Sequence, residues 1–284
     1  MKHFLIYTNL QKDRDLAVTG HIREYLEQRG CSVSVLTEES GRSEVEQLQD
    51  CGAEKAECML VLGGDGTILR AVRNIRKLHI PILGINLGTL GYMTEVEPEC
   101  IDSALDQLLA GEAEREGRMM LRAQVNTANG HREEQWALND VVITRAGSLQ
   151  IKDFNIYVNG QFLKKYSADG IIITTPTGST GYNLSAGGPI AEPGTKVMMI
   201  TPICAHTLSQ RSIVLSAQDR IVVEIPVGRD GQSQEVEASF DGDAQKKMCT
   251  GDSITITRSD EEAVFLKLSK ASFLEVLRRK MSES

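Results

Sequence analysis

The stretch LVLGGDGTILRAV, residues 60–72, determines how the rest of this chain is interpreted. An apolar run ends in Gly63 and Gly64, and a segment with Ile68 and Val72 on one helical face follows. This order predicts a strand, a tight turn and a helix, which together leave backbone N–H groups open to an anion. The turn is not a Walker A loop, because no lysine follows its last glycine, and it lacks the GxGxxG spacing of a dinucleotide fingerprint.

A carboxylate, Asp65, stands at the centre of this glycine turn. Beside phosphates a negative charge is costly unless it has a task, and two tasks fit. Asp65 could take the proton of an attacking hydroxyl as a general base, or it could help to hold Mg²⁺ against the phosphates. Both indicate phosphoryl transfer from a nucleotide to an alcohol. The alternative is structural, with the glycines forming only a turn and Asp65 capping the helix.

The segments around this stretch alternate between strand-like and helix-like patterns over the first 115 residues. Such alternation predicts an α/β domain with a doubly wound, Rossmann-like parallel sheet. The expected strands are residues 4–8, 31–35, 58–62 and 80–85, and the expected helices are residues 18–26, 68–75 and 101–108.

The pattern changes near residue 115 to short apolar runs separated by turn residues. Asn129-Gly130 and Asn159-Gly160 each lie between strand-like runs, which is a strong hairpin signal. We therefore expect an α/β domain over residues 1–115 and a β-rich, mainly antiparallel domain over residues 116–269, with a helical tail near 270–284 that can pack back on the first. The later expected strands are residues 170–174, 196–201, 220–226, 234–240, 252–257 and 263–268.

Composition excludes several classes of function. The 284 residues are 41% hydrophobic and 25% charged with a net charge of −8, which argues against nucleic acid as a partner. No apolar run reaches the roughly 20 residues of a membrane span. The six cysteines are scattered without a CxxC pair, so we expect reduced thiols and a cytoplasmic location.

The longest motif is ADGIIITTPTGSTGYNLSAGGPI, residues 168–190. It predicts a buried strand that leads into a loop dense in hydroxyls and glycines. The Thr and Ser side chains can bind a polar ligand, and Tyr182 can stack on a purine or give its hydroxyl to a ribose. The alternative is a structural turn in which these hydroxyls satisfy the backbone.

Four motifs in the same order resemble the signatures of the NAD kinase family. They are GGDGT, GINLGTLGYMTE (residues 84–95), ALNDVVITR (137–145) and the 168–190 motif; TPICAHTLSQRSIVL (201–215) is similar in style, with His206 expected to be structural. The first motif alone is shared with lipid kinases and phosphofructokinases. The resemblance implies ATP- and Mg²⁺-dependent phosphorylation of the 2′-hydroxyl of the adenosine ribose of NAD, by a homodimer or homotetramer that binds small-molecule nucleotides.

The resemblance also implies roles for particular residues. Asp65 would be the general base, and Gly64 and Gly66 would cradle phosphates. In the second domain, Asp169 would orient the dinucleotide, and the adenosine part of NAD would be held by Asn139, Asp140, Thr180, Gly181, Tyr182 and Ser185. No direct protein ligand of Mg²⁺ is assigned, although Asp65 is a candidate, and the cation facing ATP stays open, with Arg70 considered. The expected contacts to NAD or ATP are Gly64, Gly66, Thr67, Asn86, Tyr92, Asn139, Asp140, Asp169, Thr177, Ser179, Thr180, Gly181, Tyr182, Asn183, Leu184 and Ser185.

The chain departs from the family pattern at three places. Asp140 stands where a glutamate is usual, Gly181 where an alanine is usual, and Asp243 near the place of a glutamine in bacterial members. Three alternatives stay open: a diacylglycerol-type lipid kinase, a non-catalytic dinucleotide sensor and, less well supported, a sugar kinase. The polar 168–190 loop argues against an apolar acceptor, and Asp65 argues against a sensor.

Overall fold

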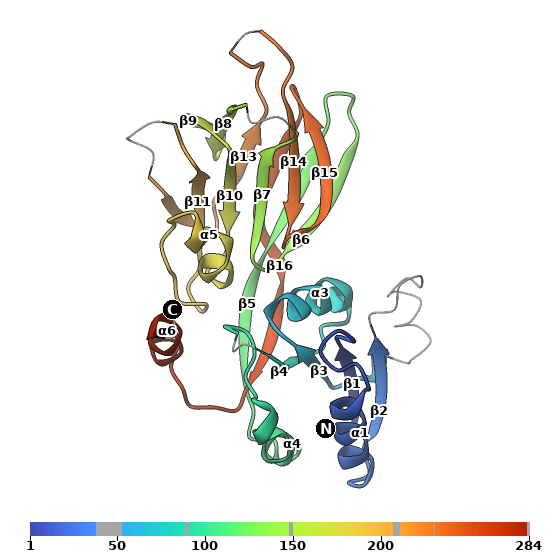
Figure 1. Cartoon of the computed structure of the whole chain (residues 1–284). Coiled ribbons are helices and arrows are strands. Elements are labelled where there is room, and N and C mark those ends of the chain that lie inside the picture. Colours follow the sequence, from blue (N-terminus) through green and yellow to red (C-terminus); the bar gives the residue numbers. More distant parts are fainter. Residues whose placement is uncertain (38–52, 89–90, 148–149, 207–210, 230, 283–284) are drawn as a thin grey trace. The chain divides into compact units, whose positions relative to one another are not determined.

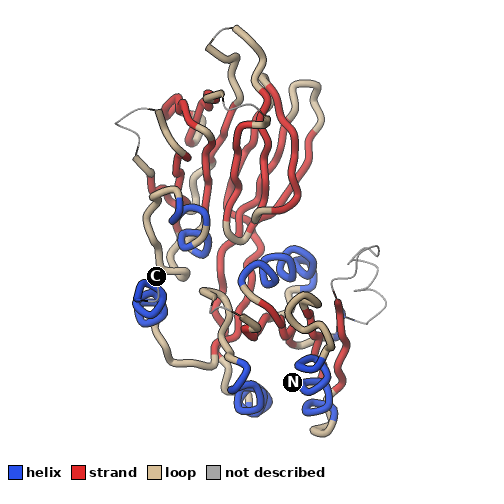
Figure 2. The backbone as a smooth tube through the Cα atoms, viewed as in Figure 1, coloured by secondary structure: helices blue, strands red, loops and turns tan. Residues whose placement is uncertain are grey.

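The chain folds into two compact units in the computed structural model. Unit 1 comprises Met1–Gly117 and Ala263–Ser284, and unit 2 comprises Arg118–Glu262. Helices are concentrated in unit 1 and strands dominate unit 2 (Figure 2). The structure describes residues 1–37, 53–88, 91–147, 150–206, 211–229 and 231–282 (Figure 1).

Unit 1 contains the parallel sheet that strand–helix alternation predicts. The described strands lie in the order β2-β1-β3-β4, and every neighbouring pair is parallel. Strand β3 is buried along its whole length, as expected of a parallel strand covered on both faces. The bounds are β1 (His3–Thr8), β2 (Ser32–Thr37), β3 (Cys58–Gly63) and β4 (Ile82–Asn86).

Helices cover both faces of this sheet, so the predicted doubly wound fold is confirmed. Apolar residues of α1 (Ala17–Glu27) and α4 (Ile101–Ala110) share one core with the strands. Helix α3 (Asp65–Ile75) lies on the other face, where Ile68 packs so closely over Gly84 of β4 that a Cβ there would overlap it (Figure 1). Short 3₁₀ turns are η1 (Ala53–Lys55), η2 (Arg76–Leu78) and η3 (Pro98–Cys100).

The strand order places a topological switch point between β1 and β3. From β1 the chain passes through α1 to β2 on one side, whereas β3 lies on the other side of β1. In open α/β sheets, ligands bind at the carboxyl ends of the strands beside such a point. Here those ends lead into Asn9, Gly64 and Leu87, so the glycine turn lies where a ligand is expected.

Unit 2 is an antiparallel β-sandwich, as the hairpin signals predict. Its described strands form two sheets whose buried residues, among them Ile143, Ile171 and Phe154, make one shared core. One sheet has the order β12-β11-β10-β7-β14-β15: β7 (Asp140–Arg145), β10 (Gly170–Thr174), β11 (Val197–Ile203), β12 (Ile213–Ser216), β14 (Glu235–Phe240) and β15 (Asp243–Cys249). The other contains β5 (Glu114–Asn126), β6 (Arg132–Ala137), β8 (Lys152–Val158), β9 (Gln161–Ala168), β13 (Ile221–Glu224) and β16 (Ser253–Lys267).

Two-residue turns join several of these strands. Asn159-Gly160 links β8 to β9 and Asp241-Gly242 links β14 to β15, and all four residues have positive φ. Both pairs therefore fit type I′ turns, for which Asn-Gly and Asp-Gly are the favoured sequences. The remaining helical elements are η4 (Thr177–Thr180), α5 (Tyr182–Ser185) and α6 (Phe273–Ser282).

One expectation about strands is wrong. The runs 252–257 and 263–268 are not two strands but one continuous strand, β16, of 15 residues. Strand β16 pairs with β5 as well as with β13. In the charged segment, Arg258 and Lys196 both form ion pairs with Glu262, at 2.8 Å each. Strand β16 thereby contributes residues to both units, and its Phe265 pairs with Ile82 of β4.

Candidate active site

Asp65 is the first residue of α3, but its side chain does not cap that helix. Gly64 occupies the N-cap position without a side-chain hydrogen bond. The Asp65 carboxylate instead accepts the backbone N–H of Tyr92 at 2.8 Å on one oxygen and that of Met93 at 3.0 Å on the other. The loop after β4 therefore fixes the direction of the carboxylate, and each oxygen keeps a lone pair for another partner.

Gly91 gives Asp65 the room for this arrangement. A Cβ built on Gly91 would overlap the Asp65 carboxylate, so no larger residue fits there without moving it. The Gly91 N–H donates to the Thr94 hydroxyl at 3.1 Å, which holds the glycine in place.

Gly91→Ala is expected to displace the Asp65 carboxylate and to lower kcat at least 10-fold, because misplacement of a reacting group by about 1 Å can cost about 10²-fold. The measurement is steady-state turnover, with Gly20→Ala as the control, since a Cβ at Gly20 meets nothing within 4 Å. Equal turnover in Gly91→Ala and the wild type would show that the position of Asp65 does not matter.

The C-terminal part of unit 1 fastens the loop that holds Asp65. A Glu95 oxygen accepts the N–H groups of Leu268 and Ser269, at 3.0 and 2.6 Å. Lys280 of α6 lies 5.2 Å from the centre of the Tyr92 ring, within cation–π range. Burial and the Asp65 carboxylate raise the pKa of Tyr92, so its hydroxyl stays protonated at neutral pH.

The other predicted residues of unit 1 line the same strand ends. Thr67 is buried against Gly63, where a Cβ would overlap the threonine side chain. Asn86, at the end of β4, is 4% exposed; its Nδ2 donates to the Gly88 carbonyl at 2.8 Å. Its Oδ1 is buried and has no hydrogen-bond partner among the described residues. Gly66 is exposed on the first turn of α3.

In unit 2, the Asn139-Asp140 pair is held by a residue that the sequence did not single out. The Asp241 carboxylate accepts the backbone N–H groups of Leu138 and Asn139, both at 2.7 Å, and of Asp140 at 3.1 Å. The left-handed conformation of Asp241, φ 53°, comes from the two-residue turn between β14 and β15. A hairpin turn thus fixes the backbone of the candidate adenosine-binding residues.

The turn after β10 is bonded to the same Asn139. The Thr174 hydroxyl and the Thr175 N–H donate to the Asn139 carbonyl at 2.9 and 2.8 Å, and the Thr175 hydroxyl donates to the Leu138 carbonyl at 2.6 Å. A Cβ on Gly178 would overlap the Asn139 carbonyl oxygen, so the close approach requires glycine. The motifs at 137–145 and 168–190 therefore form one cluster.

The predicted residues of this cluster fall into three groups. Ser179 and Asn183 are fully buried and make internal hydrogen bonds: Ser179 with Ala191, and Asn183 with the Ser179 and Pro189 carbonyls and the Thr201 hydroxyl. These two shape the loop. The polar atoms Asn139 Oδ1 and Thr177 Oγ1 are buried without a partner in the described part of the chain. The Thr180 hydroxyl donates to the Thr177 carbonyl at 3.4 Å, Gly181 is the N-cap residue of α5, and Tyr182, Leu184 and Ser185 are exposed.

Asp169 is not part of this cluster. It precedes β10, whereas Thr175 follows it, and Gly170 pairs with Thr144 while Thr174 pairs with Asp140. A strand of five residues separates its two ends by roughly 16 Å. Asp169 instead forms an ion pair with Arg145 at 3.3 Å.

The Asp140 side chain is 5% exposed and close to Asp241. Burial, and next the Asp241 charge, raise the pKa of the Asp140 carboxyl to about 7. The folded protein therefore holds a proton that an unfolded chain releases near pH 4. Its contribution to stability is present at low pH and is lost as the pH rises to about 7.

Asp140→Asn cannot ionise, so its stability relative to the wild type should increase as the pH is raised from 5 to 8. Urea unfolding at four pH values measures this difference. Asp241→Asn removes the neighbouring charge and should reduce the pH dependence seen in the wild type. A pH-independent difference between Asp140→Asn and the wild type would contradict the raised pKa.

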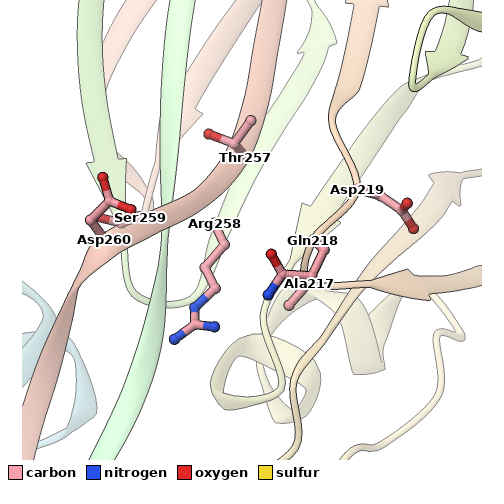
Figure 3. A pocket seen from close by; sticks show the side chains of 7 residues that line it. All are labelled: Ala217, Gln218, Asp219, Thr257, Arg258, Ser259 and Asp260. Carbon is pink, nitrogen blue, oxygen red and sulfur yellow. The ribbon is translucent and has the colours of Figure 1, made fainter.

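One cavity lies apart from these clusters. It has a volume of about 280 Å³, lies in unit 2 and is lined by residues such as Gln218, Asp219 and Arg258, with none of the predicted site residues among them (Figure 3).

The described residues contain no group of three His, Cys, Asp or Glu side chains that could hold a metal ion. None of the helices described is long and apolar enough to cross a membrane.

Sequence reasoning missed Asp241 and Lys12. The Asp241-Gly242 pair is visible as a hairpin turn, but nothing local indicates that the Asp241 carboxylate accepts a backbone N–H 101 residues away. Lys12 follows β1, and its ammonium lies 3.0 Å from the place where a Cβ on Gly64 or Gly88 would be. The sequence signal for Lys12 is its position shortly after β1, a strand at the switch point. The motif at 201–215 lies partly outside the described residues, which omit 207–210.

Known proteins resemble this chain over its whole length. The N-terminal domain model of ATP-NAD kinases matches residues 5–113, and the C-terminal domain model matches residues 138–268. The NAD kinase of Agathobacter rectalis is 45% identical, over 99% of each chain, and that of Carboxydothermus hydrogenoformans is 42% identical, over 87% of this chain and 86% of its own.

Solved structures of NAD and NADH kinases are also similar to this chain. An NAD kinase from Archaeoglobus fulgidus in complex with ATP has a TM-score of 0.78 and 26% identity, with 100% of each chain covered. Yeast NADH kinase complexed with NADH has a TM-score of 0.85 at 24% identity, covering 99% of this chain and 88% of its own, and shows likeness of fold. With both domain models matched and full-length relatives above 40% identity, this chain belongs to the NAD kinase family.

Proposed function

We propose that this protein transfers the γ-phosphoryl group of ATP to the 2′-hydroxyl of the adenosine ribose of NAD, giving NADP and ADP. The observation that carries the proposal is the Asp65 carboxylate, held by two backbone amides at the start of α3 beside a glycine turn. A binding protein gains nothing from a carboxylate fixed beside a phosphate site, whereas a kinase needs a base there.

In the proposed reaction, Asp65 takes the proton of the 2′-hydroxyl while that oxygen forms a bond to the γ-phosphorus. The bond between the γ-phosphorus and the oxygen bridging to the β-phosphate breaks, and ADP leaves with that oxygen. Backbone N–H groups at the start of α3, such as that of Gly66, would stabilise phosphate charge.

The NAD side of the proposal rests on the cluster around Asn139. Its unpartnered Oδ1 suits the amino group of an adenine, Asp140 suits a ribose hydroxyl pair, and the exposed Tyr182 ring suits stacking. Thr177 Oγ1 is a further buried polar atom without a partner among the described residues. We assign Asp169 to orientation of the dinucleotide only as the family resemblance implies, because it lies at the other end of β10.

Mg²⁺ enters the proposal as part of the substrate MgATP. Divalent magnesium takes oxygen ligands and is commonly held by substrate phosphates with one or two carboxylates. Each Asp65 oxygen already accepts an amide hydrogen and keeps a second lone pair, so Asp65 is the residue that could add a ligand. Mg²⁺ would neutralise the charge that develops on the transferred phosphoryl group.

A coupled assay with NAD, ATP and Mg²⁺, in which an NADP-specific dehydrogenase detects the product, tests the function. The same preparation is offered NADH and diacylglycerol in mixed micelles. NADP formation supports the proposal. Phosphorylation of diacylglycerol without NADP would favour the lipid kinase, and NAD binding without consumption of ATP would favour the sensor.

The free thiols of Cys31, Cys58, Cys100, Cys204 and Cys249 support our proposal that the protein works in the reducing cytoplasm. We also propose a homodimer or homotetramer. Light scattering coupled to gel filtration tests the assembly, and a monomeric mass would contradict it.

A further inference from the structure

Lys12 lies at the anion-binding turn although it precedes Gly64 of that turn by 52 residues in the sequence. Its Nζ is 3.0 Å from the point where a Cβ on Gly64 would stand, and equally close to that point on Gly88. The ammonium therefore occupies space that two side chains would otherwise fill, at the ends of β3 and β4. The ammonium thus lies next to Gly64, which directly precedes Asp65.

The backbone of Lys12 is held firmly by Asn9, which is 7% exposed. The Asn9 carbonyl accepts the N–H of Lys12 at 2.9 Å, and the Asn9 amide donates to the Thr67 hydroxyl of α3 at 3.2 Å. The Asn9 N–H donates to the Leu62 carbonyl at 3.1 Å. The turn that carries the lysine is thus bonded both to β3 and to α3.

None of the acidic side chains that the structure describes forms an ion pair with Lys12. The Lys12 side chain is exposed. The adjacent Asp13 is turned away, since its carboxylate accepts the N–H groups of Val18 and Thr19 at the start of α1. A cation without a counter-charge beside a helix N-terminus is suited to an anion.

A second observation also indicates a ligand at this place. Asn86 ends β4, pairs with Gly63 across the sheet and is 4% exposed, yet its Oδ1 has no partner among the described residues. Buried polar atoms are usually hydrogen-bonded. An unpaired one at the carboxyl end of a strand, where open α/β sheets bind their ligands, indicates a missing partner such as ligand-bound water.

We propose that Lys12 is the cation that binds the triphosphate of the phosphoryl donor, in the role that a lysine within the glycine loop performs in Walker A proteins. The inference rests on the proposed function for the identity of the donor. Lys12 would contact the phosphates next to Asp65 and balance the negative charge that the carboxylate brings to the turn. Lys12 replaces Arg70 as the candidate for this role.

The test compares Lys12→Met with Lys77→Met in the full-length protein. Lys77 is exposed in η2, beyond the opposite end of α3, so it matches the charge change away from the turn. Calorimetric titration with inorganic tripolyphosphate and Mg²⁺ measures anion binding, and steady-state kinetics give the KM for ATP and for NAD. Gly88→Ala keeps the lysine but fills the place of its ammonium.

We expect Lys12→Met to weaken tripolyphosphate binding by about 10- to 100-fold and to lower kcat/KM for ATP similarly, as loss of a charge-assisted contact does. The KM for NAD should change less than threefold, Lys77→Met should match the wild type, and Gly88→Ala should shift in the same direction as Lys12→Met. Wild-type tripolyphosphate affinity in Lys12→Met, or no such binding by the wild type, would overturn the inference. The binding arm does not depend on the acceptor, so a wild type that binds tripolyphosphate but makes no NADP would refute the function alone.

Discussion

Asp65→Asn is expected to lower kcat for NADP formation by about 10²- to 10⁴-fold, the range that a general base contributes. The affinity for NAD, measured by calorimetry, should stay within about threefold, because the candidate NAD-binding residues around Asn139 keep all their hydrogen bonds. The structure adds a second effect of this change. The two amide hydrogens of Tyr92 and Met93 bond different oxygens of Asp65, and asparagine keeps only one of these oxygens, so one N–H faces an NH₂ group and loses its partner.

Loss of that partner costs about 1–3 kcal/mol of stability, so the activity loss needs a control. Thr94→Val removes the acceptor of the Gly91 N–H in the same loop and leaves the carboxylate in place. It should lose comparable stability but less than about 10-fold in kcat. If Asp65→Asn retained near-normal turnover, or if Thr94→Val lost as much, the general-base role would be refuted.

Asp241→Ala should have the largest effect on folding and on NAD binding together. The substitution leaves the N–H groups of Leu138, Asn139 and Asp140 without the carboxylate and puts alanine at a φ of 53°. Unpaired amides cost about 1–3 kcal/mol each and strained backbone about 1–3 kcal/mol, less whatever water recovers. We therefore expect a loss of about 3–5 kcal/mol in urea unfolding and at least 10-fold weaker NAD binding.

Asn159→Ala is the matched control for the turn itself. Asn159 has nearly the same φ, 51°, in the hairpin between β8 and β9, but its side chain bonds Asp219 and Arg220. It should lose stability and bind NAD normally. NAD affinity in Asp241→Ala equal to that in Asn159→Ala would show that Asp241 does not position the adenosine-binding residues.

The fold could be predicted where the signals are local. Alternation of strands and helices, with the glycine turn after Leu62, indicates a parallel sheet, and Asn159-Gly160 indicates a hairpin because only certain residues tolerate positive φ. The continuity of β16 could not be predicted, because the partners of this segment are distant in sequence: β16 pairs with β5 and β13, and Glu262 forms an ion pair with Lys196.

The candidate site could be predicted only as far as each motif extends. The direction of the Asp65 carboxylate depends on backbone amides 27 and 28 residues away. The position of the Asn139 backbone depends on a carboxylate 102 residues away. Likewise a list of hydroxyls cannot separate Ser179, which bonds Ala191 in the interior, from Thr177, whose Oγ1 has no partner in the described residues. These assignments depend on tertiary contacts that no single motif contains.

The most direct test of the proposed kinase activity is phosphorus-31 NMR of a reaction that contains only the purified protein, NAD, ATP and Mg²⁺. We expect ADP to appear together with one equivalent of a phosphomonoester on the 2′-oxygen of the adenosine ribose, and neither to appear at a comparable rate with Asp65→Asn. Release of inorganic phosphate without that monoester, or no consumption of ATP by well-folded wild-type protein, would contradict the proposed activity.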